Sequence, residues 1–502
     1  MMKVKVFIKN TVTLVMTSLL LRSIGIIFRI YLSNKIGSEG IGLYQLIFSV
    51  YMLVATFAST GVSTAVTRLV AENAERGRSA VSRIMKKAII LSVVVGGVTA
   101  VVTHTCAPLI AKYWIKDMAA VEALQILSFS LVFMGISSCI RGYFIARRKA
   151  TQPSAAQLFE QLVRMVVIVL ALKKSVGLGV AAAASAVLFG DTVAETASCA
   201  LSGLLYFVDS KKIKKGGEVK GSYKDILHIS LPLAGAGYVS TALHTAENLL
   251  VPTRLSLFYG MRERGLELYG AIRGMAMPVL FFPASFLTSL STMLIPEVSE
   301  SVASGDSSTV KRTVCTSLKT TMILSIFVGT VFLVWGEELA LVIYKDSDVG
   351  YIIRVLSVIV PFMYMESVAA GILKGLDQQM SMFGYNLFDS TIRIIAVFLL
   401  LPRFGINGYL GVMIVSNCFT SSLCCNKLLQ TADVKIDVKN WVLTPIFIAM
   451  SGGILSQFLF SAVGSTLLRF CLGFLMQTAV FAIYFIRKES TNIQIIKKCR
   501  GC

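Results

Sequence analysis

The sequence predicts an all-α polytopic membrane protein, and three observations support this fold class. Hydrophobic residues make up 55% of the 502-residue chain and charged residues only 15%, whereas charged residues approach about a quarter of an ordinary soluble domain. Apolar runs of about 20 residues, the length that a helix needs to cross a bilayer, recur from end to end. The net charge of +21 gathers in short segments between these runs, which is typical of membrane topology rather than of nucleic-acid binding.

About fourteen transmembrane helices are expected. Runs of this length suit helices, because barrel strands need only about 10 residues to cross. The first apolar run continues directly into Arg22, so no cleavable signal peptide is expected. The expected spans are residues 10–33, 40–67, 87–108, 120–144, 155–173, 177–208, 225–252, 267–296, 316–336, 350–373, 381–402, 406–430, 440–462 and 467–486.

The distribution of positive residues predicts the orientation. If the spans are threaded through a bilayer, 31 of the 48 lysines and arginines fall on the side that holds the N-terminus, the basic segments 68–87, 141–149 and 211–224, and the C-terminal tail. Positive residues concentrate on the cytoplasmic side of membrane proteins. We therefore expect a multi-pass protein of the cell membrane with both termini in the cytoplasm.

The sequence also contains an internal repeat at a spacing of about 229 residues. Leu158-Phe159-Glu160 with Arg164 returns as Leu387-Phe388-Asp389 with Arg393, Leu127-Ser128 returns as Leu356-Ser357, and Gly179 returns as Gly408. The predicted parts are an N-lobe of spans 1–6 (residues 1–210), a basic cytoplasmic linker (211–224), a C-lobe of spans 7–12 (225–432), and spans 13 and 14 with a cytoplasmic tail (433–502). Because six is even, the two lobes should share one orientation, be related by a pseudo-two-fold axis along the membrane normal and enclose a central cleft.

Arginines inside the spans provide the first functional indication. Arg22 and Arg29 are seven residues apart, so they project from nearly the same face of the first helix, two turns apart. An arginine at the centre of a lone spanning helix costs roughly 2.5–3.5 kcal/mol, which implies that this face meets water, a partner charge or an anionic ligand. Arg273 enters the eighth span at a similar depth. Together they predict a positive wall suited to phosphate, because a guanidinium binds phosphate through two parallel hydrogen bonds. Snorkelling or internal pairing is the alternative.

Carboxylates inside the spans are candidates for structural pairing or for ion, proton or gating roles. Glu160 with Arg164, and Asp389 with Arg393, are spaced i, i+4 and can neutralise each other on one helix face. Asp191 and Glu195 share a face of the sixth span, where they can bind an ion or proton or neutralise an arginine of a neighbouring helix. Glu247, which shares a face with His244, presents the same choice. Neither a metal nor a cofactor is expected. The ten cysteines suit unpaired thiols, and the pattern Cys499–Cys502 predicts no specific role.

The opening of the chain resembles a known family. Arg22-Ser23-Ile24-Gly25, Arg29, Ile36–Gly40 and Gly42-Leu43-Tyr44-Gln45 are similar to the stage V sporulation protein B group of the multidrug/oligosaccharidyl-lipid/polysaccharide (MOP) exporter superfamily, which also includes the MurJ-type lipid II flippases. The resemblance implies a V-shaped, two-lobed transporter whose central arginines engage the pyrophosphate of an undecaprenyl-linked precursor. Arg22, Arg29 (shifted by about one residue) and Arg273 match that arginine set.

Two departures from the flippase pattern leave the substrate open. The second-span arginine of those flippases has no counterpart in residues 57–61, and the glutamate three residues after the eighth-span arginine is Ala276 here.

The leading hypothesis is a flippase or exporter that moves an undecaprenyl-pyrophosphate-linked cell-wall, spore-cortex or polysaccharide precursor across the cytoplasmic membrane by alternating access. Its partners would be the bilayer, the lipid-linked oligosaccharide, and a proton, Na⁺ or the membrane potential. The alternative is a multidrug/cation antiporter of the same superfamily that uses Asp191, Glu195 or Glu247. A membrane-embedded glycan polymerase is disfavoured because the sequence has three histidines and lacks long outer loops; a non-transporting scaffold stays open.

Overall fold

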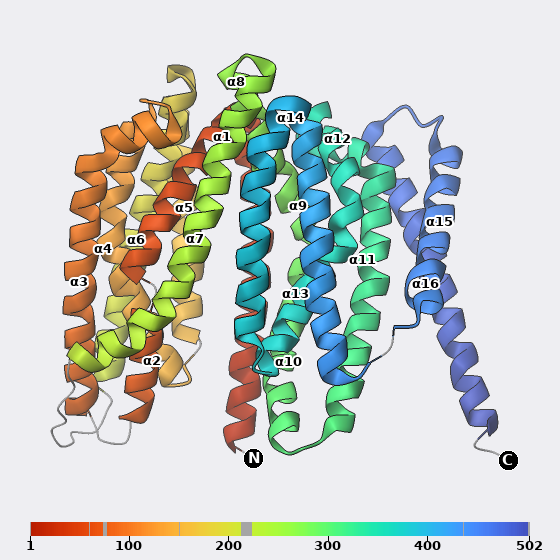
Figure 1. Cartoon of the computed structure of the whole chain (residues 1–502), viewed down its shortest axis with the longest axis horizontal. Helices are drawn as coiled ribbons and strands as arrows, with labels where there is room; N and C mark the ends of the chain where they lie inside the picture. The colour runs from red at the N-terminus through yellow and green to blue at the C-terminus, as the bar shows by residue number, and fades with distance from the viewer. Residues whose placement is uncertain are drawn as a thin grey trace. The chain divides into compact units, whose positions relative to one another are not determined.

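The computed structural model describes residues 2–59, 61–73, 78–149, 151–211, 223–434 and 436–499. Throughout these ranges the regular structure is helical and no strand is present (Figure 1). Ten helical stretches of the described chain are long and apolar enough to cross a membrane. The predicted fold class, an all-α polytopic membrane protein, is confirmed.

Two of the ten stretches are long enough to cross twice. Residues 16–72 and 379–432 contain 57 and 54 residues, whereas one crossing needs about 20. Each is interrupted at a glycine with left-handed backbone, Gly37 (φ 72°) and Gly405 (φ 57°). A left-handed residue breaks the helical hydrogen-bond ladder at little cost only when it is glycine. The two remaining expected spans coincide with α7 and with the helices α8–α10. If the two long stretches each cross twice, the described helices account for about fourteen crossings.

The first compact unit comprises residues 1–270 and 390–405. Neighbouring helices of this unit, α3 with α4 and α5 with α6, pack along their lengths (Figure 1). Its elements are α1 (Met2–Ser59), α2 (Val62–Glu72), α3 (Arg78–Leu109), the π-helical turn η2 (Ile110–Ile115), α4 (Ala120–Ala146), α5 (Thr151–Ser175), the 3₁₀ turn η3 (Val176–Leu178), α6 (Val180–Ser210), α7 (Tyr223–Tyr259) and α8 (Arg262–Gly270).

The second compact unit comprises residues 271–389 and 406–502. Within it α11 packs against α12, α13 and α15, and α15 packs against α16. Its elements are the π-helical turn η4 (Ala271–Ala276), α9 (Met277–Phe281), α10 (Ala284–Ala303), α11 (Ser307–Ile343), α12 (Ser347–Leu356), the 3₁₀ turn η5 (Ser357–Ile359), α13 (Val360–Gly375), α14 (Gln379–Ala432), the π-helical turn η6 (Lys439–Leu443), α15 (Thr444–Phe460) and α16 (Thr466–Cys499). Residues 390–405 of α14 belong to the first unit.

Two predicted spans are interrupted in the structure. The span expected at 40–67 is divided, because α1 ends at Ser59 and α2 begins at Val62 after Gly61, whose φ is 86°. The span expected at 267–296 is divided among α8, η4, α9 and α10. Pro278 lies in the first turn of α9 and Pro283 caps α10; proline has no amide hydrogen for the helical ladder, so each favours a new helix start.

The predicted parts of the chain are only partly described. Residues 212–222 of the expected linker 211–224 lie outside the described residues, as do Cys502 and the side chain of Cys499. The N-lobe, C-lobe and C-terminal segment with these boundaries stay predictions. In the structure, the first unit extends through α7 and α8 to Gly270. Gly179 has a positive φ of 103°, whereas its repeat counterpart Gly408 does not, and the positive-φ glycine of α14 is Gly405.

Close backbone contact joins α8 to α1 within the first unit. A β-carbon on Gly42 would lie 2.2 Å from the Leu266 carbonyl oxygen, and one on Gly270 would lie 1.9 Å from the Ser38 carbonyl oxygen. Small residues allow helix backbones to approach this closely in membranes. The glycine-rich motif at residues 36–42 therefore has two local roles: Gly37 interrupts the helical backbone of α1, and Gly42 lets α8 pack closely against α1.

We predict that Gly42→Ala destabilises the protein by about 1–3 kcal/mol, the usual cost of inserting a methyl group into a packed interior. The reason is that the rigid Leu266 backbone cannot move away as a side chain could. The thermal unfolding midpoint of the purified protein in detergent measures the effect.

Gly97→Ala provides the matched control, because Gly97 is helical in α3 and a β-carbon there meets nothing within 4 Å. This variant should be neutral or up to about 1 kcal/mol more stable, since alanine is the better helix former. Equal midpoints for the Gly42 and Gly97 variants would argue against the close α1–α8 contact.

Candidate functional site

The arginines of α1 lie on the helix before the Gly37 break. Arg22 and Arg29 are both exposed side chains of this segment. The Ser33 hydroxyl donates a hydrogen bond of 2.9 Å to the Arg29 carbonyl oxygen, which satisfies the serine within the helix. Arg29 makes no ion pair with a carboxylate of the described chain. Its charge lies within electrostatic range of the Tyr44 hydroxyl.

Arg273, the third predicted arginine, lies in the π-helical turn η4 of the second unit. The residue is half-buried, and its Nε atom is buried. π-Helical turns are often found at functional sites. The assembly of Arg22, Arg29 and Arg273 into one positive wall stays a prediction.

A compact ionic cluster connects α1, α5 and α6 in the first unit. Arg164 contacts two carboxylates: its Nη2 lies 2.6 Å from Glu160 Oε1, and its Nε lies 2.8 Å from Asp191 Oδ1. Its Nη1 donates to Gln161 Oε1 at 2.8 Å. The Tyr44 hydroxyl reaches the other Asp191 oxygen at 3.5 Å. The Arg164 guanidinium thus contacts three acceptor side chains, and the cluster links α1, α5 and α6.

For Asp191 and Glu195 of the sixth span, the sequence left two roles open: binding an ion or proton, or neutralising an arginine of a neighbouring helix. Asp191 contacts an arginine of a neighbouring helix, which is the structural alternative. Glu195 lies within electrostatic range of Glu160 and Arg141 and remains the sixth-span acid available for a proton or gating role. Among the described residues, no group of three or more histidine, cysteine or acidic side chains could hold a metal ion.

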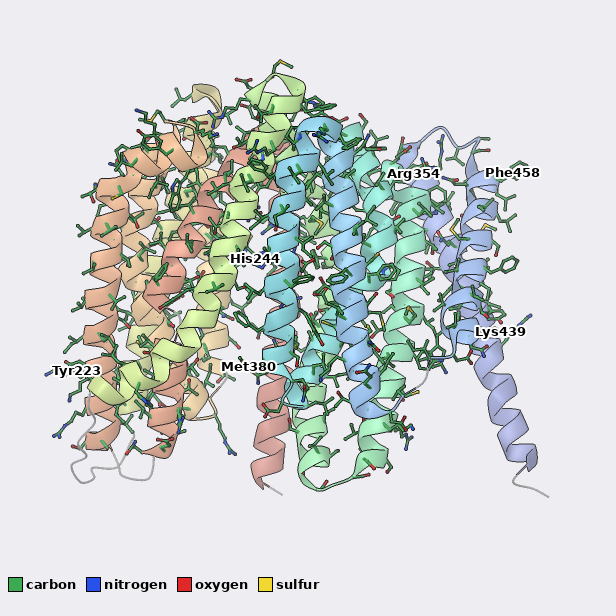
Figure 2. The ribbon with its side chains drawn as sticks, in the orientation of Figure 1. Tyr223, His244, Arg354, Met380, Lys439 and Phe458 are labelled. Carbon is green, nitrogen blue, oxygen red and sulfur yellow. The ribbon has the colours of Figure 1, made fainter. Side chains whose placement is uncertain are left out.

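A second ion pair joins α7 to α14. Arg393 Nε lies 3.5 Å from Glu247 Oε2, and the side chain of Glu247 is only 2% exposed. His244, one turn earlier on α7, is exposed and is labelled halfway along this helix in Figure 2. In the second unit, Asp389 accepts a hydrogen bond of 2.5 Å from the Ser416 hydroxyl. Both members of the expected Asp389/Arg393 pair therefore have partners outside the i, i+4 spacing.

Tyr44 is the residue of this site that sequence reasoning missed as a contact. It lies in the motif Gly42-Leu43-Tyr44-Gln45, which was noted only as part of a family pattern. The structure explains it: the same short motif that seats α8 with Gly42 also brings the Tyr44 hydroxyl to Asp191.

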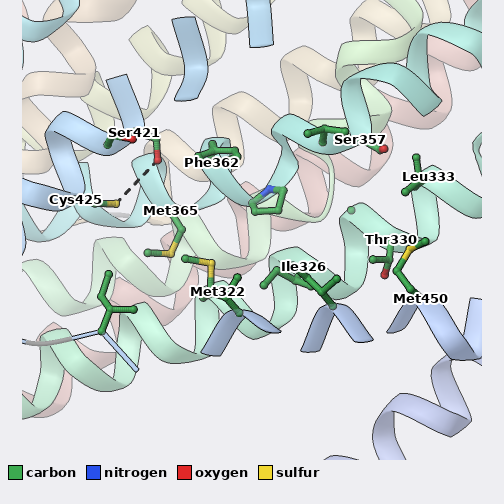
Figure 3. Close-up of a pocket in the computed structure, with 17 residues that line it drawn as sticks. Met322, Ile326, Thr330, Leu333, Ser357, Phe362, Met365, Ser421, Cys425 and Met450 are labelled. Atoms are coloured by element: carbon green, nitrogen blue, oxygen red, sulfur yellow. Dashed lines mark hydrogen bonds between the residues drawn. The ribbon is translucent and has the colours of Figure 1, made fainter. Parts of the chain in front are cut away.

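An apolar cavity of about 630 Å³ lies in the second unit, between α11, α13, the second half of α14 and α15. Its lining includes Met322, Ile326, Phe362, Met365 and Met450 (Figure 3). The nearby Ser421 and Cys425 contact each other at 4.0 Å. No charged residue lines the cavity, so it can hold hydrocarbon but offers nothing to bind an ionic headgroup.

The family model described as "Polysaccharide biosynthesis protein" matches residues 7–302, which is more than half of the chain. The chain belongs to this polysaccharide biosynthesis family. Stage V sporulation protein B of Bacillus subtilis (strain 168) is 23% identical over 467 residues, covering 90% of this chain and 89% of that protein. The lipid II flippase MurJ of the same organism is 22% identical over 351 residues, covering 64% of this chain and 62% of that protein.

Solved structures confirm the fold of this family member. The lipid II flippase MurJ in an inward closed conformation superposes with a TM-score of 0.70 at 13% identity, covering 95% of this chain and 99% of that one. An inward-facing multidrug resistance MATE transporter of the MOP superfamily gives a TM-score of 0.67 at 12% identity, covering 84% and 98%. The predicted resemblance to the stage V sporulation protein B group is confirmed.

We predict that Arg164 and Asp191 are energetically coupled. Arg164→Ala removes the cation that faces both Glu160 and Asp191, and Asp191→Ala leaves Arg164 with Glu160 alone. Breaking a fully buried pair costs about 3–5 kcal/mol, which is the upper bound here. The double variant should lose less than the sum of the two, with a coupling of about 0.5–3 kcal/mol. Thermal unfolding of the four proteins in detergent measures the cycle.

The exposed pair Arg68–Glu72, at 2.8 Å, is the matched control. An exposed i, i+4 pair is worth only about 0.3–0.5 kcal/mol, so alanine variants there should shift the midpoint little. Strict additivity of Arg164→Ala and Asp191→Ala would mean that this cluster does not fasten the helices.

Proposed function

We propose that this protein is a flippase that moves an undecaprenyl-pyrophosphate-linked cell-wall, spore-cortex or polysaccharide precursor across the cytoplasmic membrane. The supporting observation is the contrast between two arginines of the first unit. Arg164 is enclosed by Glu160 and Asp191, whereas Arg29 is exposed and makes no ion pair with a described carboxylate. An arginine kept in an apolar helix without a fixed counterion favours an anionic ligand over a cationic one.

Arg22 and Arg29 are suited to a pyrophosphate by their spacing. Two turns of helix place the guanidinium groups about 11 Å apart along the axis, and each flexible side chain can lean toward a group between them. Each charge-assisted hydrogen bond contributes about 1.5–3 kcal/mol net. Arg273 is the third arginine proposed to bind substrate, and the name of the relative lipid II flippase MurJ agrees with a lipid-linked substrate.

Transport would proceed by alternating access, with binding and release as its steps and no covalent chemistry. We propose that both termini are cytoplasmic and that the headgroup occupies the arginine site while the polyprenyl chain stays in lipid. A membrane potential does about 2.3 kcal/mol of work per elementary charge per 100 mV. Movement of the charged site can therefore couple transport to the potential; a proton or Na⁺ acting at Glu195 is the other route.

The antiporter alternative has less support from the first unit. Such an antiporter needs an acid that is free to exchange a cation, but Asp191 contacts Arg164 and Glu247 contacts Arg393. The likeness to MATE transporters is a likeness of fold. Efflux of a cationic dye driven by a Na⁺ or pH gradient would favour the alternative, and Glu195→Gln would then abolish that efflux.

We predict that Arg22→Ala with Arg29→Ala abolishes complementation in a strain depleted of the native copy. Losing one charge-assisted hydrogen bond of about 1.5–3 kcal/mol weakens binding roughly tenfold to a hundredfold, and losing two should reduce transport below detection. The measurement is the amount of lipid-linked precursor that accumulates on the inner leaflet, at a matched level of protein in the membrane.

Arg29→Lys and Arg68→Ala are the controls. Lysine keeps the charge without the two-pronged donor geometry, so partial activity is expected. Arg68→Ala removes another exposed arginine, one that pairs with Glu72, and should leave transport intact. Full activity of the Arg22/Arg29 double variant would remove the basis of the proposed function.

A further inference from the structure

A cavity with two basic residues in its lining lies in the first unit. It has a volume of about 580 Å³ and is enclosed by α1, the π-helical turn η2 and the second half of α7. None of Arg22, Arg29 and Arg273 lines it. Two other cations do: Arg254 of α7 and Lys116 at the end of η2.

Arg254 is positioned by an aromatic ring and lacks an anion. Its guanidinium carbon lies 3.6 Å from the centre of the Phe398 ring, a cation–π contact that holds the planar group in place. Its Nε atom is buried and has no hydrogen-bond partner in the described chain. A guanidinium presents five N–H donors, and a buried donor without an acceptor costs about 1–3 kcal/mol. An acceptor supplied from outside the protein would remove that cost.

Lys116 adds a second positive charge at the same cavity. It adopts a left-handed conformation (φ 59°, ψ 31°) at the C-terminal end of η2, and it makes no ion pair with a described residue. Asp117, the next residue after Lys116, contacts Arg262 at 3.1 Å, and Glu247, seven residues before Arg254 on α7, contacts Arg393 at 3.5 Å. The cavity therefore carries two positive charges that the described protein does not neutralise.

The remaining walls favour an anion attached to hydrocarbon. Leu53, Leu249, Leu250 and Leu257 give an apolar surface, and Tyr113 and Trp114 are half-exposed or more beside Lys116. Tyrosine and tryptophan gather where a membrane protein meets the lipid headgroups. A volume of about 580 Å³ is within the range of about 300–1,000 Å³ typical of small-molecule sites, which is far more than one phosphate ion needs.

We propose that this cavity binds the headgroup phosphate of an anionic phospholipid, with Arg254 and Lys116 as the phosphate ligands and the leucines against the lipid's apolar portion. On the orientation predicted from the positive residues, it lies toward the outer side of the membrane. The proposal does not depend on the cargo of the transporter. It identifies a lipid site formed entirely by the first unit.

Native mass spectrometry of the full-length protein in a neutral detergent tests this proposal. Palmitoyl-oleoyl phosphatidylglycerol is titrated into wild-type protein, Arg254→Gln, Lys116→Gln and the double variant. Each single change should weaken binding of the most tightly held lipid about tenfold, because each removes a charge-assisted contact with phosphate. The double variant should lose about a hundredfold, and Arg254→Lys should lie between wild type and Arg254→Gln.

Lys345→Gln is the matched control, because Lys345 is also an exposed lysine with positive φ (57°) at the end of a helix. It should bind the lipid like wild type. Palmitoyl-oleoyl glycerol, which has no phosphate, should bind weakly and equally to every variant. Inorganic phosphate at the same concentration should not displace phosphatidylglycerol.

Three outcomes would overturn the proposal: equal phosphatidylglycerol affinity in all variants, equal losses in Lys345→Gln, or binding of inorganic phosphate without retention of phosphatidylglycerol. Arg254→Gln also removes the contact with Phe398 and can lower stability. Lys116→Gln changes only an exposed turn, so its result stands even if the Arg254 variant fails to fold.

Discussion

Neutralisation of arginine within apolar helices is the constraint on which this structure depends. A guanidinium cannot lose its charge at any physiological pH, so each arginine must be matched by a carboxylate, by water or by a bound anion. Arg164 shows the internal solution, since Glu160, Gln161 and Asp191 surround it. Arg29 and Arg254 are not matched by described carboxylates, and each belongs to a site at which an anionic ligand is proposed.

The two halves of the repeat use equivalent residues differently. Glu160 and Arg164 contact each other directly on α5. Their counterparts Asp389 and Arg393 contact Ser416 and Glu247, respectively. The i, i+4 spacing of an acid and an arginine thus predicts where charged side chains lie on a helix. It does not predict their contacts, which also depend on the neighbouring helix.

The fold was largely predictable from sequence because long apolar helices have a strong and simple signature. Most predicted spans match described helices to within several residues. The exceptions have local causes that hydropathy does not register: Gly61 with positive φ divides one span, and Pro283 with η4 divides another.

The candidate site was less predictable from the sequence than the fold. Asp191 was recognised as an acid needing an explanation, but its contact with Arg164 depends on the packing of α6 against α5. Arg254 was placed beyond the end of a span at residue 252, whereas α7 continues to Tyr259, and its Phe398 contact joins residues far apart in the chain.

Gly37 divides the first helix into two segments that contact different neighbours. On the C-terminal side of Gly37, Ser38 and Gly42 lie in backbone contact with α8. The segment on its N-terminal side carries Arg22 and Arg29. A β-carbon at Gly37 would meet nothing within 4 Å, so this residue is small because of its backbone angles and not because of crowding. Before Gly37, Phe28, Leu32 and Ile36 pack in one buried cluster with residues of α5 and α6. The backbone angles of this one residue therefore let a single helix bury one half against α8 and the other half against the α5–α6 pair.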